Sequence, residues 1–306
     1  MSEQIPSAII GLGSTAVDDL VYVRQYPEAD SKMPVLREER DCGGLTMTAL
    51  VAASRLGVKC AYAGTLGSDD LSTFVLRRLS AERIDVSRVR IEEAARPIHS
   101  TIIVDETEGT RNIFFNTASV PGASSDAPEA SCIAQAKVLF IDNFGVEGMI
   151  RAAKIARQNG VAVVADFEDD QHAGFGELLQ LVDHLILSYG FACRVTGCTE
   201  PQEIVERLWH SNRSLVAVTC GKEGCWFKAG SNEPVCRQEA FQVKVADTTG
   251  CGDVFHGAYA ASLVMEMPAT QRIRFASAAA ALKATKPGGQ AGSPDRYTVE
   301  QFLQQH

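Results

Sequence analysis

The sequence lacks an uninterrupted apolar run of about 18 residues, which is the length that an α-helix needs to cross the hydrocarbon core of a bilayer. It also opens without a charged segment followed by an apolar one, so we expect no secretory leader. Positive charge is in deficit, because 29 lysines and arginines face 38 acidic residues and leave a net charge of −9. These absences argue against a membrane protein and against a nucleic acid as partner.

The nine cysteines form no C-x-x-C pair, and their number is odd. Neither a structural zinc site nor a thioredoxin-like motif is therefore indicated. The two C-x4-C pairs, Cys193 with Cys198 and Cys220 with Cys225, have the wrong spacing for structural zinc. Buried, reduced thiols in a cytoplasmic protein are the better interpretation.

What the chain does contain is an alternation of strand-like and helix-like segments from residue 137 onward. The length of 306 residues and an apolar share of 45% allow one large α/β domain or two small ones. Continuous apolar strands predict a mainly parallel central sheet with helices on both faces. The predicted strand–helix pairs are 138–141 with 148–158, 161–165 with 176–181 and 184–187 with 199–209, followed by a strand at 215–219 and helices at 252–265 and 274–284.

Polar residues follow these strands at the edge where parallel sheets bind ligands, namely Asn143, Asp166, Glu168 and Ser188. Asn143 and Asp166 are the candidates for contacts with a substrate. Because the carboxyl ends of parallel strands meet at one edge, residues far apart in the sequence converge there.

The N-terminal half begins with a predicted buried strand at residues 7–12, which runs into Gly11-Leu12-Gly13-Ser14-Thr15-Ala16. This matches the G-x-G-x-x-A dinucleotide fingerprint, which requires a helix directly afterwards. The residues that follow are β-branched and extended, which argues against a dinucleotide site. Further predicted elements are strands within 19–40 and 59–64, helices at 45–56 and 71–82, a hairpin of 98–104 with 111–116 and a loop at 121–128.

One stretch, Asp247-Thr248-Thr249-Gly250-Cys251-Gly252-Asp253-Val254-Phe255-His256-Gly257-Ala258, turns through two glycines into a helix of small residues. It follows an apolar, strand-like run that includes Phe241, Val243 and Val245. A glycine turn at a helix N-terminus aims unpaired N–H groups and the positive end of the helix dipole at one point, which predicts a phosphate site. Asp253 would repel a phosphate there unless it had a chemical role, so we interpret it as the acceptor of a hydroxyl proton. The alternative is an ordinary acidic residue in the first turn of a helix.

This stretch resembles the C-terminal signature of the ribokinase-like (PfkB) carbohydrate kinases, D-T-T-G-A-G-D, with Cys251 in place of the usual alanine. The resemblance covers nearly the whole chain and is strongest between residues 216 and 294. It implies a ribokinase-like three-layer α/β/α fold, with residues 1–306 as a single kinase domain. It also implies transfer of a phosphoryl group from ATP, with Mg²⁺, to a sugar-like alcohol. In that family the roles of catalytic base and anion hole fall on Asp253 and on Gly250, Cys251 and Gly252.

The resemblance also implies the substrate side of the site. Asp18 takes the place of the acid that binds sugar hydroxyls, although Asp18 and Asp19 could equally form a simple polar turn. Gly43 and Gly44 permit close approach of a ligand to the backbone. The family's two asparagines after these glycines are replaced by Leu45 and Thr48, so the identity of the sugar is in doubt. The further candidates for substrate contacts are Thr48 and Asn143.

A small sheet built from strands within residues 19–40 and 96–116 covers the sugar site in this family, and it often pairs with a second subunit. We therefore expect a lid sheet in this chain, and a homodimer formed through it. The alternative from the sequence alone is that residues 98–116 form an edge hairpin of the main sheet.

On the nucleotide side, the turn at residues 220–226 resembles the family's G-x-x-G motif, and the loop at 286–292 resembles the one that closes over adenine. The implied nucleotide contacts are Ser188, Thr219, Gly221, Gly224, Thr248, Gly250, Gly252, Ser277 and Gly288. Backbone carbonyls of this region can also wrap a potassium ion in related kinases, here those of Asp247, Thr249, Gly288 and Gly292. The usual N-x-x-E motif, linked to magnesium, is absent at residues 188–191, so no protein ligand for Mg²⁺ is assigned.

The segment Phe275-Ala276-Ser277, the ending at 287–292 and the helix start at 253–257 particularly resemble the sulfofructose-kinase branch. The region from 142 to 145 carries no arginine of the kind that a sulfonate would require. A nucleoside kinase and a catalytically idle binding protein on the same fold stay open as alternatives. The retained carboxylate of Asp253 favours an enzyme.

Overall fold

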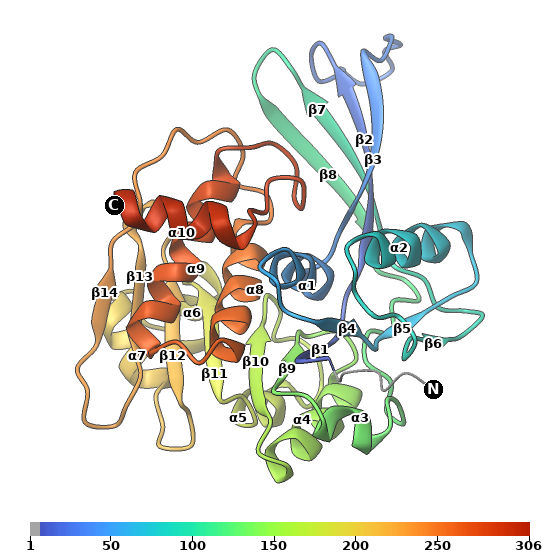
Figure 1. Cartoon of the computed structure of the whole chain (residues 1–306). Coiled ribbons are helices and arrows are strands. Elements are labelled where there is room, and N and C mark those ends of the chain that lie inside the picture. The colour runs from blue at the N-terminus through green and yellow to red at the C-terminus, as the bar shows by residue number, and fades with distance from the viewer. Residues whose placement is uncertain (1–6) are drawn as a thin grey trace.

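An eight-stranded sheet forms the centre of the computed structural model, which describes residues 7–306 (Figure 1). In spatial order its strands are β14 (Cys236–Gln238), β13 (Cys225–Lys228), β12 (Leu215–Thr219), β11 (His184–Ser188), β10 (Ala162–Asp166), β9 (Val138–Ile141), β1 (Ile9–Leu12) and β4 (Cys60–Tyr62). The strands from β12 to β4 are parallel, whereas β13 is antiparallel to both of its neighbours. The mainly parallel sheet expected from the apolar runs is thus confirmed.

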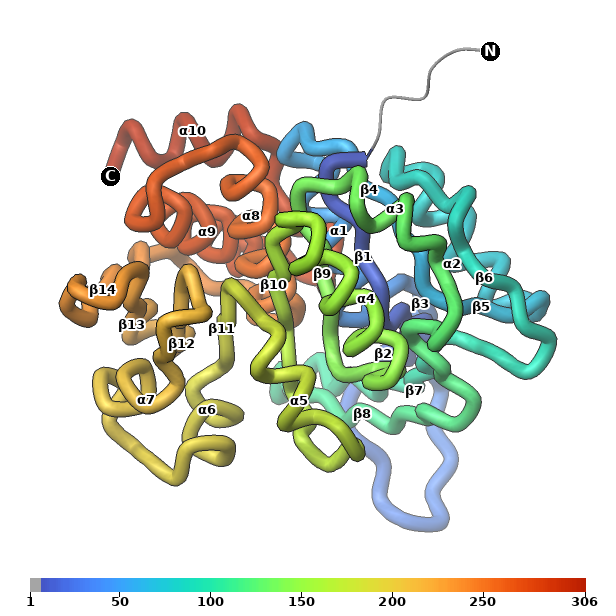
Figure 2. Tube along the Cα trace, turned by 90° about the horizontal axis from the view of Figure 1, so that it is seen from below, coloured from blue at the N-terminus to red at the C-terminus, as the bar shows by residue number. Residues whose placement is uncertain are grey.

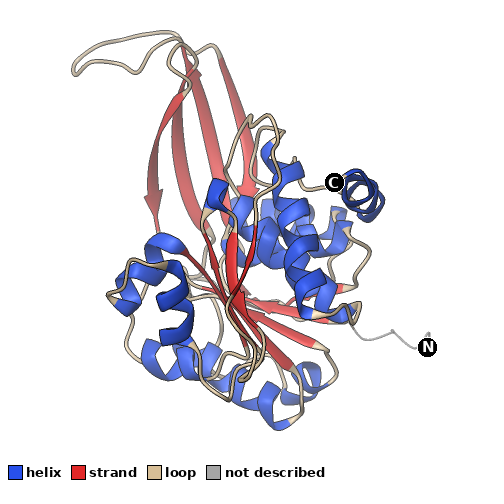
Figure 3. Ribbon diagram, turned by 90° about the vertical axis from the view of Figure 1, so that its left-hand side faces the viewer, coloured by secondary structure: helices blue, strands red, loops and turns tan. Residues whose placement is uncertain are grey.

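Helices cover both faces of this sheet, as Figure 3 shows. One group packs in a core with the first face and consists of α1 (Leu45–Arg55), α2 (Asp70–Ala81), α8 (Cys251–Val264), α9 (Ala269–Ala284) and α10 (Arg296–Gln305). The other group packs against the second face and consists of α3 (Ala130–Ala134), α4 (Val146–Gln158), α5 (Phe175–Gln180), α6 (Tyr189–Thr196) and α7 (Pro201–Leu208). The three-layer α/β/α architecture follows from this arrangement.

The first strand, β1, lies one strand from the edge of the sheet, between β9 and the edge strand β4 (Figure 2). The strand after it, β2 (Ala16–Val23), is extended and not helical, so the dinucleotide fingerprint lacks the helix that it needs. Asp142, at the end of β9, instead accepts hydrogen bonds from the N–H and hydroxyl of Ser14 and from the Thr46 hydroxyl. Burial raises the pKa of Asp142 to about 6, although these donors oppose the shift.

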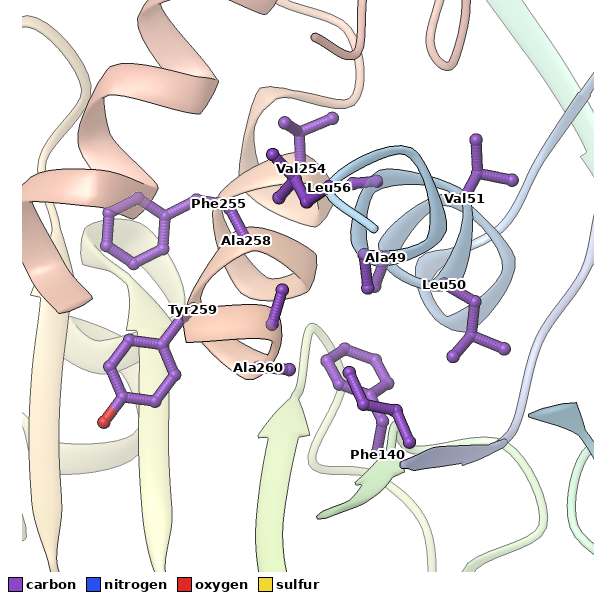
Figure 4. Packing of buried hydrophobic residues seen from close by; sticks show 14 of the residues in the cluster. Ala49, Leu50, Val51, Leu56, Phe140, Val254, Phe255, Ala258, Tyr259 and Ala260 are labelled. Atoms are coloured by element: carbon purple, nitrogen blue, oxygen red, sulfur yellow. The ribbon is translucent and has the colours of Figure 1, made fainter. Parts of the chain in front are cut away.

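A close helix contact in the core joins α1 and α8. Figure 4 shows side chains of both helices packed beside Phe140 of β9. Gly257 faces α1 at this contact, and a Cβ there would collide with the carbonyl oxygen of Ala49. Only a glycine lets the two helix backbones approach so closely.

A separate four-stranded sheet rises from the body in Figure 1, with the order β3 (Arg37–Gly43), β2, β7 (Ile98–Asp105) and β8 (Thr110–Asn116). The predicted strands within 19–40 and 96–116 therefore pair with one another. Since β7 and β8 belong to this sheet, the alternative of an edge hairpin on the main sheet is wrong. A third, two-stranded sheet consists of β5 (Thr65–Leu66) and β6 (Arg90–Ile91).

Three local expectations differ from the structure. The run with Phe241, Val243 and Val245 forms no strand, since the sheet already ends at β14 and Phe241 packs edge-on against Phe302 of α10. Helix α6 was not expected, because its aromatic residues, glycine and β-branched residues are weak helix formers. Helix α9 starts at residue 269, directly after a proline, and not at 274.

Within residues 7–306, no helix combines the length and the apolar character that crossing a membrane demands.

Candidate active site

The turn before α8 forms a nest of backbone donors. Gly250 precedes the helix with φ 73°, and a Cβ there would lie 2.6 Å from the carbonyl oxygen of Gly289, so a glycine is required. In the described part of the chain, the N–H groups of Gly250 and Gly252 meet no acceptor. The N–H of Cys251 donates to the Thr248 carbonyl at 3.2 Å. The signature implies that this N–H is free to bind an anion, and that expectation is wrong. Two unpaired donors at the start of a 14-residue helix make an anion site.

Asp253 lies in the first turn of α8, partly buried, beside this nest. Burial raises its pKa well above the usual range, and the neighbouring carboxylates of Asp166 and Glu168 raise it further. His256 acts in the opposite direction. A carboxylate whose pKa is raised toward the working pH is suited to accept a proton from a hydroxyl group.

His256 and Asp166 lie together next to this carboxylate. The Nδ1 atom of His256 is 2.8 Å from the carbonyl oxygen of Gly252 and 3.1 Å from Oδ2 of Asp166, and Nε2 is 3.0 Å from the carbonyl oxygen of Ile186. Burial raises the pKa of Asp166 and lowers that of His256. The imidazole therefore links the first turn of α8 to β11, whereas Oδ2 of Asp166 on β10 lies beside it without a hydrogen bond. His256 was missed from the sequence, because a histidine at a helix position with small neighbours carries no signal of its own.

Gly43 at the end of β3, Gly44 directly after it and the acid on β2 lie together at the base of the four-stranded sheet. Oδ2 of Asp18 would lie 2.9 Å from a Cβ at Gly43, and Gly44 follows with φ 94°. Burial raises the pKa of Asp18, and the facing carboxylate of Asp41 on β3 contributes to the rise. The structure thus brings Asp18, Gly43 and Gly44 together, as expected for one ligand site.

Two other candidates for substrate contacts are engaged inside the protein. The Thr48 hydroxyl accepts a hydrogen bond from Nε2 of Gln290 at 3.3 Å, and both residues are buried. Oδ1 of Asn143 accepts a hydrogen bond from the N–H of Glu168 at 3.2 Å, and only 2% of Asn143 is exposed. Thr48 therefore positions the loop at 286–292, while Asn143 orders the segment after β10.

Four of the residues expected on the nucleotide side lie at or after the ends of β11 and β12, and others lie on or before helices. Ser188 and Thr219 pair in register at the ends of β11 and β12, and Ser188 is exposed. The 3₁₀ turn Gly221–Glu223 directly follows β12, and Gly224 continues it into β13. Ser277 is half-buried on α9, and Thr248 is exposed before the nest.

Asp247 anchors the turn to its surroundings. Its Oδ1 accepts hydrogen bonds from the N–H and hydroxyl of Thr249 at 2.9 and 2.7 Å, and its Oδ2 accepts one from the N–H of Gly288 at 3.0 Å. Arg111 of β8 lies 3.2 Å from the same carboxylate. Burial would raise the pKa of Asp247, but these donors and the charge of Lys283 lower it to about 2. The carboxylate is therefore ionised and holds three segments together.

No cluster of three or more His, Cys, Asp or Glu side chains placed to hold a metal occurs among residues 7–306. The nine cysteines are all free thiols, as the sequence predicts, but the expectation that they are buried is wrong for most of them. Only Cys42, Cys60, Cys198 and Cys225 are buried, and Cys236 is exposed. A magnesium ion at this site would thus have to take most of its ligands from phosphate oxygens and water.

Comparison with known proteins identifies a family and a fold to which the chain is similar. The family model for pfkB family carbohydrate kinases matches residues 9–296. The ribokinase of Haemophilus influenzae is 27% identical over 305 residues, covering 96% of this chain and 97% of that protein. A crystal structure of a ribokinase candidate from Agrobacterium tumefaciens has a TM-score of 0.89 at 28% identity and covers 98% of both chains. A structure of Arabidopsis thaliana ribokinase complexed with ribose and ATP has a TM-score of 0.85 at 22% identity, covering 97% of this chain and 99% of that one.

The chain belongs to the pfkB family of carbohydrate kinases. It is a sugar kinase, an enzyme that transfers a phosphoryl group to an alcohol, and its fold is ribokinase-like.

Proposed function

We propose that this enzyme transfers the γ-phosphoryl group of ATP to a hydroxyl group of a sugar or sugar derivative, with Asp253 as general base. The observation that carries the proposal is the placement of Asp253 in the first turn of α8, next to the unpaired N–H groups of Gly250 and Gly252. A carboxylate and an anion nest at one point serve the two needs of the reaction, proton removal and charge stabilisation.

In this mechanism the acceptor hydroxyl donates its hydrogen to Asp253 and attacks the γ-phosphorus in line. Negative charge spreads over the equatorial oxygens, and the N–H groups of the nest together with the α8 dipole stabilise it. Asp18, with the backbone at Gly43 and Gly44, holds other hydroxyls of the acceptor. Positioning and electrostatics supply most of the catalysis in phosphoryl transfer.

The nucleotide is proposed to place adenine between the turn at 220–224 and the region at 274–288. Its phosphates then point to residues 250–252. Ser188, Thr219, Gly221 and Gly224 are the proposed contacts of the nucleotide, and Thr248, Ser277 and Gly288 are proposed to close its site. A magnesium ion bound with ATP would take phosphate oxygens and water as most of its ligands and would neutralise phosphate charge there.

The acceptor is assigned only as a sugar or sugar derivative. Relatives named ribokinase make a pentose the first compound to test. Leu45 and the buried Thr48 supply no amide at the place where the family's asparagines bind sugar hydroxyls. A sulfosugar is the second candidate, from the resemblance of the C-terminal segments to the sulfofructose-kinase branch.

We also propose that residues 1–306 act as one kinase domain and that the four-stranded sheet, within 19–40 and 96–116, is its lid and dimer surface. Every residue of the edge strand β8 is exposed. Three consecutive apolar side chains of β8 are among them: Ile113, Phe114 and Phe115, exposed by 48%, 55% and 68%. An apolar edge strand of this kind is covered in most stable proteins, and a second copy of the sheet would cover it.

The function is tested by incubating the purified protein with ATP, Mg²⁺ and a panel of pentoses, hexoses, deoxysugar acids, sulfosugars and nucleosides, and by measuring ADP release. We expect one sugar class to raise ADP release far above the rate with ATP alone. Turnover of nucleosides only would assign a nucleoside kinase, and no turnover with any acceptor would contradict the proposed acceptor class.

A further inference from the structure

Lys283, in the last turn of α9, is an ammonium group with no exposed surface. Removing a charged group from water is costly unless hydrogen-bond acceptors replace its hydration. Its Nζ donates to the carbonyl oxygen of Asp247 at 2.9 Å. The buried charge is therefore attached to the first residue of the turn that forms the anion nest.

The family resemblance assigns this region to a potassium ion held by the carbonyl oxygens of Asp247, Thr249, Gly288 and Gly292. The assignment can be tested by asking whether these carbonyl oxygens already accept hydrogen bonds from the protein. Lys283 occupies the Asp247 carbonyl. The residues there do not fit a potassium ion, because the ion would need this oxygen and would be repelled by the adjacent ammonium.

The loop around Gly292 is also held by a cationic side chain. Nη1 of Arg55, on α1, donates to the carbonyl oxygens of Gln290 at 2.8 Å and Ser293 at 3.2 Å. Arg55 is itself paired with Glu82. The carbonyl groups on both sides of Gly292 thus point to the guanidinium of Arg55. This side chain supplies the positive charge that holds the loop.

We infer that Lys283 supplies the fixed positive charge behind the turn 250–252, so that phosphate binding there requires no monovalent metal ion. Lys283 is a positioning residue, since it acts through the Asp247 carbonyl and does not touch the phosphate. The inference rests on the proposed function in one respect, because it takes the turn to be the ATP phosphate site.

The first experiment uses the wild-type protein. The affinity for ATP is measured by calorimetry, and the midpoint of thermal unfolding by differential scanning fluorimetry, in choline chloride and in potassium chloride. Both salts are used at about 0.15 M, so that the screening of exposed charges is equal. We expect both quantities to be the same in the two salts. An affinity that is about tenfold higher in potassium, or an unfolding midpoint raised by potassium alone, would overturn the inference.

The second experiment replaces the charge. Lys283→Met removes it and fills the space, whereas Lys283→Ala also opens room for an ion. In choline both variants should bind ATP about ten- to hundredfold more weakly, the size expected for loss of a hydrogen bond to a charged group. Potassium or ammonium should restore Lys283→Ala and leave Lys283→Met weak. Lys154→Met, at an exposed ion pair with Glu177, is the matched control and should bind ATP normally.

Full affinity of Lys283→Met in choline, or failure of both cations to rescue Lys283→Ala, would overturn the inference. Should either variant fail to fold, the two-salt comparison on the wild type still decides. Absence of ATP binding by the wild type in either salt would refute the proposed function instead, and the unfolding midpoints would then decide whether potassium binds.

Discussion

His256 lies with its Nδ1 atom 3.1 Å from Oδ2 of Asp166, three residues after Asp253 on the same helix. The pair places the helix that carries the proposed base next to the buried carboxyl group at the end of β10. Because residues three apart share one face of a helix, the charge state of this pair acts directly on Asp253.

The first prediction concerns pH. Burial and the Asp166 and Glu168 carboxylates raise the pKa of Asp253, and the base must be ionised to accept a proton. Activity should therefore be lost as the pH falls through this raised pKa, so the acidic limb of kcat/KM should lie above the value of 3.8 for an ordinary Asp. Asp166→Asn removes a nearby negative charge and should shift that limb to lower pH.

The pH–rate profile of each variant checks this, and the limb belongs to the coupled carboxylates as a group. Asp30→Asn, at an exposed turn, is the matched control and should leave the profile unchanged. An unshifted acidic limb in Asp166→Asn would show that Asp166 does not tune the base.

The second prediction concerns the base itself. Asp253→Asn keeps the shape of the side chain but cannot accept the proton. We expect kcat to fall by about 10²–10⁴, the usual range for a positioned proton acceptor, while the affinities for ATP and sugar stay within a few-fold. Steady-state kinetics with the sugar found in the panel measures both. Near-normal turnover of Asp253→Asn would mean that another group removes the proton.

The third prediction separates binding from chemistry. Asp18→Ala should raise KM for the sugar about ten- to hundredfold, as expected when a charged hydrogen-bond partner of a ligand is lost, with a smaller effect on kcat. Asp19→Ala is the matched control, because Asp19 points to the opposite face of β2 and pairs with Arg40 and His99. If both variants changed KM equally, Asp18 would have no specific role in binding. Cys251→Ala should be nearly silent in the same assay, because the Cys251 side chain has no proposed role and its N–H stays paired with the Thr248 carbonyl.

The fourth prediction concerns the contact between α1 and α8. Gly257→Ala introduces a methyl group against the Ala49 carbonyl and should lower the free energy of unfolding by about 1–3 kcal/mol. Gly176→Ala, where a Cβ meets open space on α5, should be neutral or stabilising by up to about 1 kcal/mol. Urea unfolding followed by circular dichroism compares the two variants. Equal stability of both would contradict the close helix approach.

The fifth prediction concerns the lid sheet. Replacement of Phe114 and Phe115 by serine should convert a dimer into a monomer in analytical ultracentrifugation, because the exposed apolar edge is lost. Tyr297→Ser, which removes another exposed aromatic side chain on α10, is the control and should not change the mass. A wild-type protein that sediments as a monomer would rule out this dimer.

The sequence predicts the sheet, most helices and the glycine turn because each depends on local pattern. Apolar runs identify buried strands, and two glycines before a small-residue helix identify the anion nest. The sequence could not predict the burial of Thr48, because it depends on packing against the distant Gln290. Nor could it predict the turn hydrogen bond of Cys251, because this bond depends on the exact backbone angles of the turn. Lys283 was missed for the same reason, because a lysine in an alanine-rich helix is normally exposed.

The way in which the first strand of the main sheet is covered has a consequence for how the chain folds. Strand β1 lies next to the edge strand β4, and α1 covers it only together with α8, whose Gly257 contacts Ala49 from about 200 residues further along the sequence. Contacts between such distant segments form slowly, because a long loop must close first. During synthesis the apolar face of β1 and α1 therefore stays exposed until α8 emerges from the ribosome. A chain shortened before α8 would keep that face exposed, and we expect it to aggregate or to be degraded and not to persist as a folded fragment.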